Sequence, residues 1–137
     1  MFGSKTSRAR KLGQRIGSQL RDILAFPRTM NGGNVPDTLR YDHYVLGYHF
    51  MMCLNLYIEL KKGKTNTEEQ GLVLANALPI ALDREIKDLA PVLEGLMARP
   101  DDEFKLGTEH ANAAYDKVSR GDTTAFQQVL GNVRGKY

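Results

Sequence analysis

Apolar residues recur at helical spacing along most of the chain, and one segment, residues 37–63, is apolar on every side. Asp37 can cap the start of a helix here, and Gly63 can take the left-handed conformation that ends one. A helix that is apolar all round is either a core helix or a membrane span. A span needs about 20 largely uncharged residues. This segment places polar side chains among its apolar ones, at Asp42, His43, His49 and Asn55. We therefore predict that residues 37–63 form the buried central helix of a bundle.

The N-terminal segment, residues 1–26, has the pattern of a basic amphipathic helix. Its apolar residues recur on one side, at Leu12, Ile16, Leu20, Ile23 and Leu24. Gly13 and Gly17 each lower helix propensity by about 1 kcal/mol relative to alanine, so we expect the first turns to fray unless another element docks on them. Pro27 ends the segment, because the residue before a proline disfavours helical dihedral angles.

Helix start and stop signals divide the segment after the central helix. Residues 67–70, Thr-Glu-Glu-Gln, have the pattern of a capping box that opens a helix. Pro79 lacks a backbone N–H, so we expect a break or a kink near Leu78. A regular apolar stripe between residues 82 and 97 then predicts an amphipathic helix that is kinked or restarted at Pro91.

Two further helices are predicted near the C-terminus. Three acids at residues 101–103 follow Pro100, at the helix end where the dipole favours negative charge. Small residues in the middle of this helix should let another backbone approach closely. Gly121 and Asp122 then turn the chain into a last short helix.

These elements predict an all-α fold, because no segment alternates β-branched and polar residues over the length of a strand. A chain of 137 residues fits one domain. We expect a single-domain bundle of about six helices around the central helix at residues 37–63. Residues 1–26 form a basic N-terminal arm or helix, and residues 37–137 form the helical bundle domain.

Charge is distributed unevenly along the chain. Residues 1–26 carry six basic side chains and one acid, a net charge of +5, while the other residues carry a net charge of −2. We take five cations as the candidate contact with an anionic surface: Lys5, Arg8, Arg10, Lys11 and Arg15. The segment can equally be a docked helix with a solvated charged face, a membrane-surface helix, a contact for nucleic-acid phosphates or a mitochondrial targeting peptide.

Candidate chemistry is concentrated on the central helix. His49 and Cys53 lie four residues apart on one helical face, a spacing that suits a base beside a nucleophile or two zinc ligands. Asp42 is about 10 Å from His49 along the helix axis, so it cannot orient the imidazole directly. We expect His49 and Cys53 to be structural. A second possibility is a pocket lined by Tyr41, Asp42, His43 and His49.

The chain contains no HExxH motif, nucleophile elbow, dinucleotide fingerprint or calcium loop, and we predict no cofactor, metal ion or catalytic residue. We expect a non-enzymatic helical interaction module, an adaptor or regulator that binds a protein partner. Its basic arm would contact an anionic surface. One alternative is a small α-helical enzyme, or a metal- or ligand-binding protein, with a site near Asp42, His43, His49 and Cys53. The other is a nucleic-acid-binding helical protein. A single cysteine fits a reducing compartment, so we expect a cytoplasmic location. The mitochondrial matrix and a membrane surface are the alternative locations. The chain can also form homo-oligomers.

Overall fold

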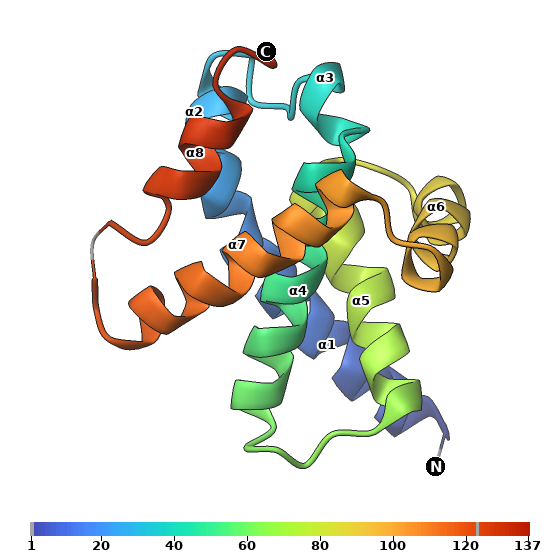
Figure 1. The fold of residues 1–137 in the computed structure, drawn as a ribbon. Coiled ribbons are helices and arrows are strands. Elements are labelled where there is room, and N and C mark those ends of the chain that lie inside the picture. The colour runs from blue at the N-terminus through green and yellow to red at the C-terminus, as the bar shows by residue number, and fades with distance from the viewer. Residues whose placement is uncertain (1, 123) are drawn as a thin grey trace.

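The computed structural model describes residues 2–122 and 124–137, with side chains described from residue 5 onward, and this part of the chain is helical without any strand. The prediction of an all-α helical bundle is confirmed. Figure 1 shows α4 in the middle of the molecule, with α7 crossing it and α1 and α5 beside it. The elements in order are α1 (Phe2–Leu20), the 3-10 turn η1 (Arg21–Leu24), α2 (Ala25–Thr29), α3 (Asp37–Arg40), α4 (His43–Leu60), α5 (Thr67–Leu82), α6 (Ile86–Ala98), α7 (Asp102–Ser119) and α8 (Gln127–Val133).

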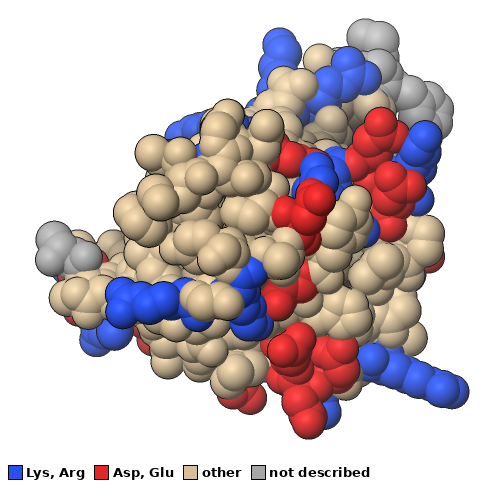
Figure 2. Space-filling view, turned by 90° about the horizontal axis from the view of Figure 1, so that it is seen from above, with Lys and Arg blue, Asp and Glu red and all other residues tan. Residues whose placement is uncertain are grey.

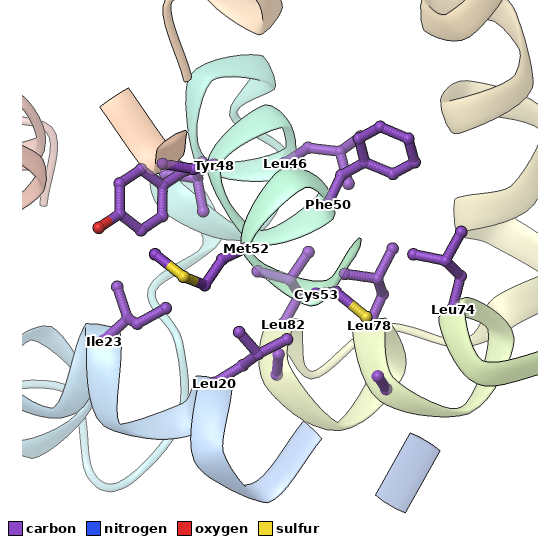
Figure 3. Packing of buried hydrophobic residues seen from close by; sticks show 14 of the residues in the cluster. Leu20, Ile23, Leu46, Tyr48, Phe50, Met52, Cys53, Leu74, Leu78 and Leu82 are labelled. Atoms are coloured by element: carbon purple, nitrogen blue, oxygen red, sulfur yellow. The ribbon is translucent and has the colours of Figure 1, made fainter. Parts of the chain in front are cut away.

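The central helix is α4, and it is shorter than residues 37–63. The backbone is extended at Asp42, whose carboxylate accepts a hydrogen bond from the Val45 N–H at 3.0 Å and so caps α4. Asp37 instead opens the separate one-turn helix α3. Side chains on several faces of α4 are buried, as its apolar pattern predicts. Figure 3 shows Met52 and Cys53 of α4 beside residues of α1, η1 and α5 in the core.

Two glycines allow α4 and α7 to cross in backbone contact. A Cβ atom built at Gly47 would lie 2.3 Å from the carbonyl oxygen of Phe104. A Cβ atom at Gly107 would lie 2.2 Å from the carbonyl oxygen of Tyr44 and 2.8 Å from the Tyr48 nitrogen. Both obstacles are backbone atoms, which cannot rotate away as a flexible side chain can. The predicted close approach along the middle of α7 is therefore present, and it is centred on Gly107.

We expect Gly107→Ala to lower the free energy of unfolding by about 1–3 kcal/mol or more, because the added methyl group forces α4 and α7 apart. Gly71 and Gly95, on α5 and α6, have open space where a Cβ atom would lie. Alanine at either should be neutral or stabilising, since it improves helix propensity. Chemical denaturation of the three variants measures the difference. Equal stability of Gly107→Ala and Gly95→Ala would contradict the proposed crossing.

Glycines also set the contact between α1 and α5. A Cβ atom at Gly13 would lie 2.7 Å from the Asn76 Cβ atom, and one at Gly17 would lie 2.9 Å from the Ala77 carbonyl oxygen. α1 is a helix from Phe2 to Leu20, which the expectation of frayed first turns allowed if another element docked on it. The reason is docking: the two glycines weaken the isolated helix but let it lie directly on α5.

The two internal prolines do not break their helices. α5 runs through Pro79 to Leu82, and α6 runs through Pro91. Of the break or kink expected near Leu78, the break is therefore absent. A proline inside a helix costs about 3 kcal/mol or more, but four side chains around Pro79 are fully buried and hold α5 in place. These are Ala77, Leu78, Ala81 and Leu82.

Candidate functional site

The outer face of α1 carries a line of cations. Ala9, Ile16 and Leu20 face the core, while every candidate cation from Lys5 to Arg15 is exposed. At about 100° per residue, Arg8, Lys11 and Arg15 fall within about 60° of one another. We call these three residues the α1 cationic stripe. α1 contains no Asp or Glu, so nothing on the helix itself neutralises the stripe.

The N-terminal end of α1 borders the start of α5. A pocket of about 510 Å³ there is lined by residues of both helices, including Lys5, Arg8, Glu68 and Glu69. The hydrogen bond from the Tyr57 hydroxyl is the main cause that lowers the pKa of Glu69, and Lys61 and Arg8 act in the same direction. This edge of the cationic stripe therefore presents charges of both signs.

Charges of both signs also alternate elsewhere on the surface. On the face in Figure 2, Asp and Glu side chains are interleaved with Lys and Arg side chains rather than separated into two fields. The ion pairs include Lys61 with Glu69 at 3.2 Å and Lys136 with Asp42 at 2.9 Å. α1 differs from these regions in that its own sequence supplies no acid, and the acids nearest to its N-terminal end come from α5.

The second predicted site is divided between surface and core. Tyr41 is exposed, with the guanidinium groups of Arg40 and Arg84 at 5.4 and 4.6 Å from its ring centre. Asp42 caps α4 and also pairs with Lys136, while Nδ1 of His43 lies 2.5 Å from Oδ2 of Asp101. Asp42 and His43 hold the start of α4 through separate contacts, while Tyr41 stacks with an arginine of α3 and one of the turn after α5. His49 is fully buried whereas Tyr41 is exposed, and a pocket shared by these residues stays a prediction.

His49 and Cys53 lie in the core. Nδ1 of His49 is 2.8 Å from the Val45 carbonyl oxygen, which fixes the tautomer with the proton on Nδ1. Burial lowers the pKa of His49 to about 4 and raises the pKa of the Cys53 thiol to about 12. A thiol with so high a pKa is a poor nucleophile, because the thiolate is the reactive form. No group of His, Cys, Asp and Glu in the described part of the chain could hold a metal ion.

The sequence did not indicate a partly buried ionic cluster around Asp83, at the C-terminal end of α5. Arg28 is almost fully buried, and its Nη1 atom lies 2.8 Å from Oδ2 of Asp83. The same carboxylate accepts a hydrogen bond from the Val35 N–H at 2.8 Å, and Arg21 approaches its other oxygen at 3.3 Å. Asp83 has a φ of 53°, in the left-handed region that few residues other than glycine adopt. The cluster ties η1, α2 and the following loop to α5.

Two hydrogen bonds made by tyrosine hydroxyls of α4 were also not predicted from the sequence. The Tyr44 hydroxyl lies 2.7 Å from Nδ1 of His110, which joins α4 to α7. Tyr57 hydrogen-bonds Glu69 at 2.7 Å. The apolar pattern of α4 indicated that its tyrosine hydroxyls need partners, but the helices that supply them could not be identified from spacing.

Comparison with known proteins found no matching family model, no similar curated protein and no similar solved structure. None of the helices in the described part of the chain has both the length and the apolar character needed to cross a membrane.

Proposed function

We propose that the protein is a non-enzymatic helical interaction module, an adaptor or regulator that binds an acidic surface on a protein partner. The contact is the α1 cationic stripe, Arg8, Lys11 and Arg15. The observation that carries the proposal is that three exposed cations lie in line on a helix that has no acid and is fixed on α5. A fixed helix presents its charges in a constant geometry, which lowers the entropy lost on binding.

A protein partner fits this surface better than a membrane. The exposed residues of α1 between Lys5 and Gln19 are all polar, so this face has no apolar side chain to insert among lipids. Charge attraction alone would hold it on a bilayer only weakly.

A nucleic-acid partner is also less suitable. The stripe extends over about 10 Å of helix, and Glu68 and Glu69 lie at its edge, where they would repel phosphates. Protein surfaces commonly pair charges of both signs across an interface, so a mixed edge favours a partner with complementary charges. The proposal places the protein in the cytoplasm, a reducing compartment in which the buried Cys53 stays a free thiol.

We expect an acidic helical peptide with glutamates at positions i, i+4 and i+7 to bind the protein, and the variant Arg8→Gln/Lys11→Gln/Arg15→Gln to bind it about tenfold more weakly. Exposed ion pairs contribute roughly 0.2–1 kcal/mol each, so three pairs account for an effect of this size. Fluorescence anisotropy of the labelled peptide measures the affinity at two salt concentrations. Binding should weaken with salt, because the Debye length falls from about 10 Å at 0.1 M to about 3 Å at 1 M.

Two controls separate this contact from general charge attraction. The variant Lys62→Gln/Lys64→Gln/Arg134→Gln loses the same charge from exposed positions outside α1 and should bind the peptide normally. A peptide of the same composition with its glutamates spread around the helix should bind less well. An equal loss of peptide affinity in the α1 variant and in the control variant would contradict the proposal. Tighter binding to duplex DNA or phosphatidylserine vesicles than to the ordered peptide would favour the other two partner classes.

A further inference from the structure

A second pocket, of about 320 Å³, lies between several segments of the bundle, away from the α1 cationic stripe. Its volume falls at the lower end of the range of small-molecule sites, about 300–1,000 Å³, and sites between the helices of a bundle are common. The wall is mainly apolar and comes from the end of α1 and η1, from α4, from α7 and from the turn before α8. Its apolar side chains include Leu20, Ile23, Met52, Leu56, Val118 and Phe126.

The polar groups of this pocket are few and of one charge sign. Gln19 and Glu59 are the polar lining residues among those the structure describes, and Glu59 is the charged one. Glu59 lies at the exposed edge of the wall, and Tyr115 is close enough for this acid to help raise the pKa of its hydroxyl, after the larger effect of burial. An apolar wall with one carboxylate at its edge complements a molecule that has an apolar body and a positive head.

The inner wall can adapt to a ligand. Met52 is buried at this wall, and its unbranched thioether side chain changes shape more easily than a branched one. Behind it is Tyr48, whose buried hydroxyl has no hydrogen-bond partner among the described residues. Figure 3 shows the Tyr48 ring on the same side of α4 as Met52 and Ile23. The core next to the pocket thus contains a buried polar group without a partner among the described residues.

We propose that this pocket binds a small amphiphilic cation, an alkylammonium whose chain lies against Met52 and Leu56 and whose head meets the Glu59 carboxylate. The proposal does not depend on the function assigned to the cationic stripe. A carboxylate-headed chain is disfavoured here, because its charge would face Glu59.

Methionine methyl groups report directly on the position of the ligand. Met52 lines this pocket, whereas Met51 and Met97 line a separate apolar groove of about 330 Å³ that contains Lys105. With ¹³C-methyl methionine labelling, n-octylammonium should shift the Met52 methyl signal until the site is saturated. The Met97 methyl signal should not change. Octanol and octanoate are matched probes, and n-octylammonium should bind about two- to fivefold more tightly than octanol, the size of one exposed ion pair. Octanoate should bind more weakly than octanol.

Two variants test the site. Glu59→Gln should remove the preference for the ammonium head, with Glu94→Gln on α6 as a control of equal charge outside the pocket. Val118→Trp should block binding, since Val118 is partly exposed at the pocket wall, and Ile58→Trp is an exposed control outside the lining. Thermal unfolding of each variant verifies the fold.

Several results would overturn the proposal. The first is an affinity for octanoate equal to that for n-octylammonium. The second is a preference for the ammonium head that remains in Glu59→Gln. The third is a shift of the Met97 methyl signal rather than the Met52 signal when n-octylammonium is added. A dimer dissociated by Val118→Trp, without any effect of n-octylammonium, would assign the pocket to a second copy of the chain instead.

Discussion

Replacing Asp83 with alanine should lower the free energy of unfolding by about 3–5 kcal/mol, because it leaves the buried guanidinium of Arg28 without its anionic partner. Burial lowers the pKa of Arg28, and the charge of Asp83 opposes that shift. The variant also loses the acceptor for the Val35 N–H and places alanine at a positive φ. Urea denaturation monitored by circular dichroism measures the loss.

Two further variants test the cause of that effect. Asp83→Asn keeps an acceptor for the Val35 N–H and tolerates the left-handed backbone, so it should cost less than alanine. Arg28→Met in the background of Asp83→Asn should recover part of the stability, because it removes the unpaired buried charge. A single Asp83→Ala variant with less than about 1 kcal/mol of destabilisation would mean that the cluster is solvated.

Acid should destabilise the fold through His49 before most carboxylates are protonated. The pKa of this buried imidazole is about 4 in the folded state, below its ordinary value of 6.5. The unfolded chain therefore binds a proton first, and stability falls as the pH decreases from about 7 towards 4. The full effect is about 3 kcal/mol, of which about 2 kcal/mol should be lost by pH 5. Above pH 7 this group contributes no pH dependence.

A variant without the imidazole isolates this contribution. The amide of His49→Asn can replace the hydrogen bond to the Val45 carbonyl, and it does not titrate. Its stability should change less than that of the original chain between pH 7 and pH 5. An NMR titration that places the pKa of His49 near 6.5 in the folded protein would contradict the interpretation.

Local signals in the sequence were sufficient to predict the fold class. The all-round apolar pattern identified α4, and the acids after Pro100 identified the start of α7, where Asp101 caps the helix by accepting a hydrogen bond from the Phe104 N–H. The capping box before α5 was misplaced by one residue, because Asn66 caps that helix. Asp37 and Asp42 are both plausible caps. In the structure α4 begins after Asp42, whose carboxylate accepts a hydrogen bond from the Val45 N–H.

Features that depend on distant residues could not be predicted in the same way. Gly13 and Gly17 lower helix propensity. Their role, which is to let α1 approach α5 closely, is visible only once the position of α5 is known. The partners Arg28 and Asp83 are 55 residues apart, and neither belongs to a recognisable motif. Exposure of the cations from Lys5 to Arg15 agrees with their helical spacing. The pocket between α1, α4 and α7 had no sequence signal, since its side chains also match an ordinary core pattern.

The most direct test of the proposed function is to locate the bound acidic peptide by NMR. The backbone amide signals of the ¹⁵N-labelled protein are recorded while the peptide with ordered glutamates is added. We expect the largest shifts between Lys5 and Arg15 on α1, with smaller changes at the start of α5. Shifts centred on α6 or α8, or spread evenly over the molecule, would contradict the assignment of the α1 cationic stripe as the contact surface.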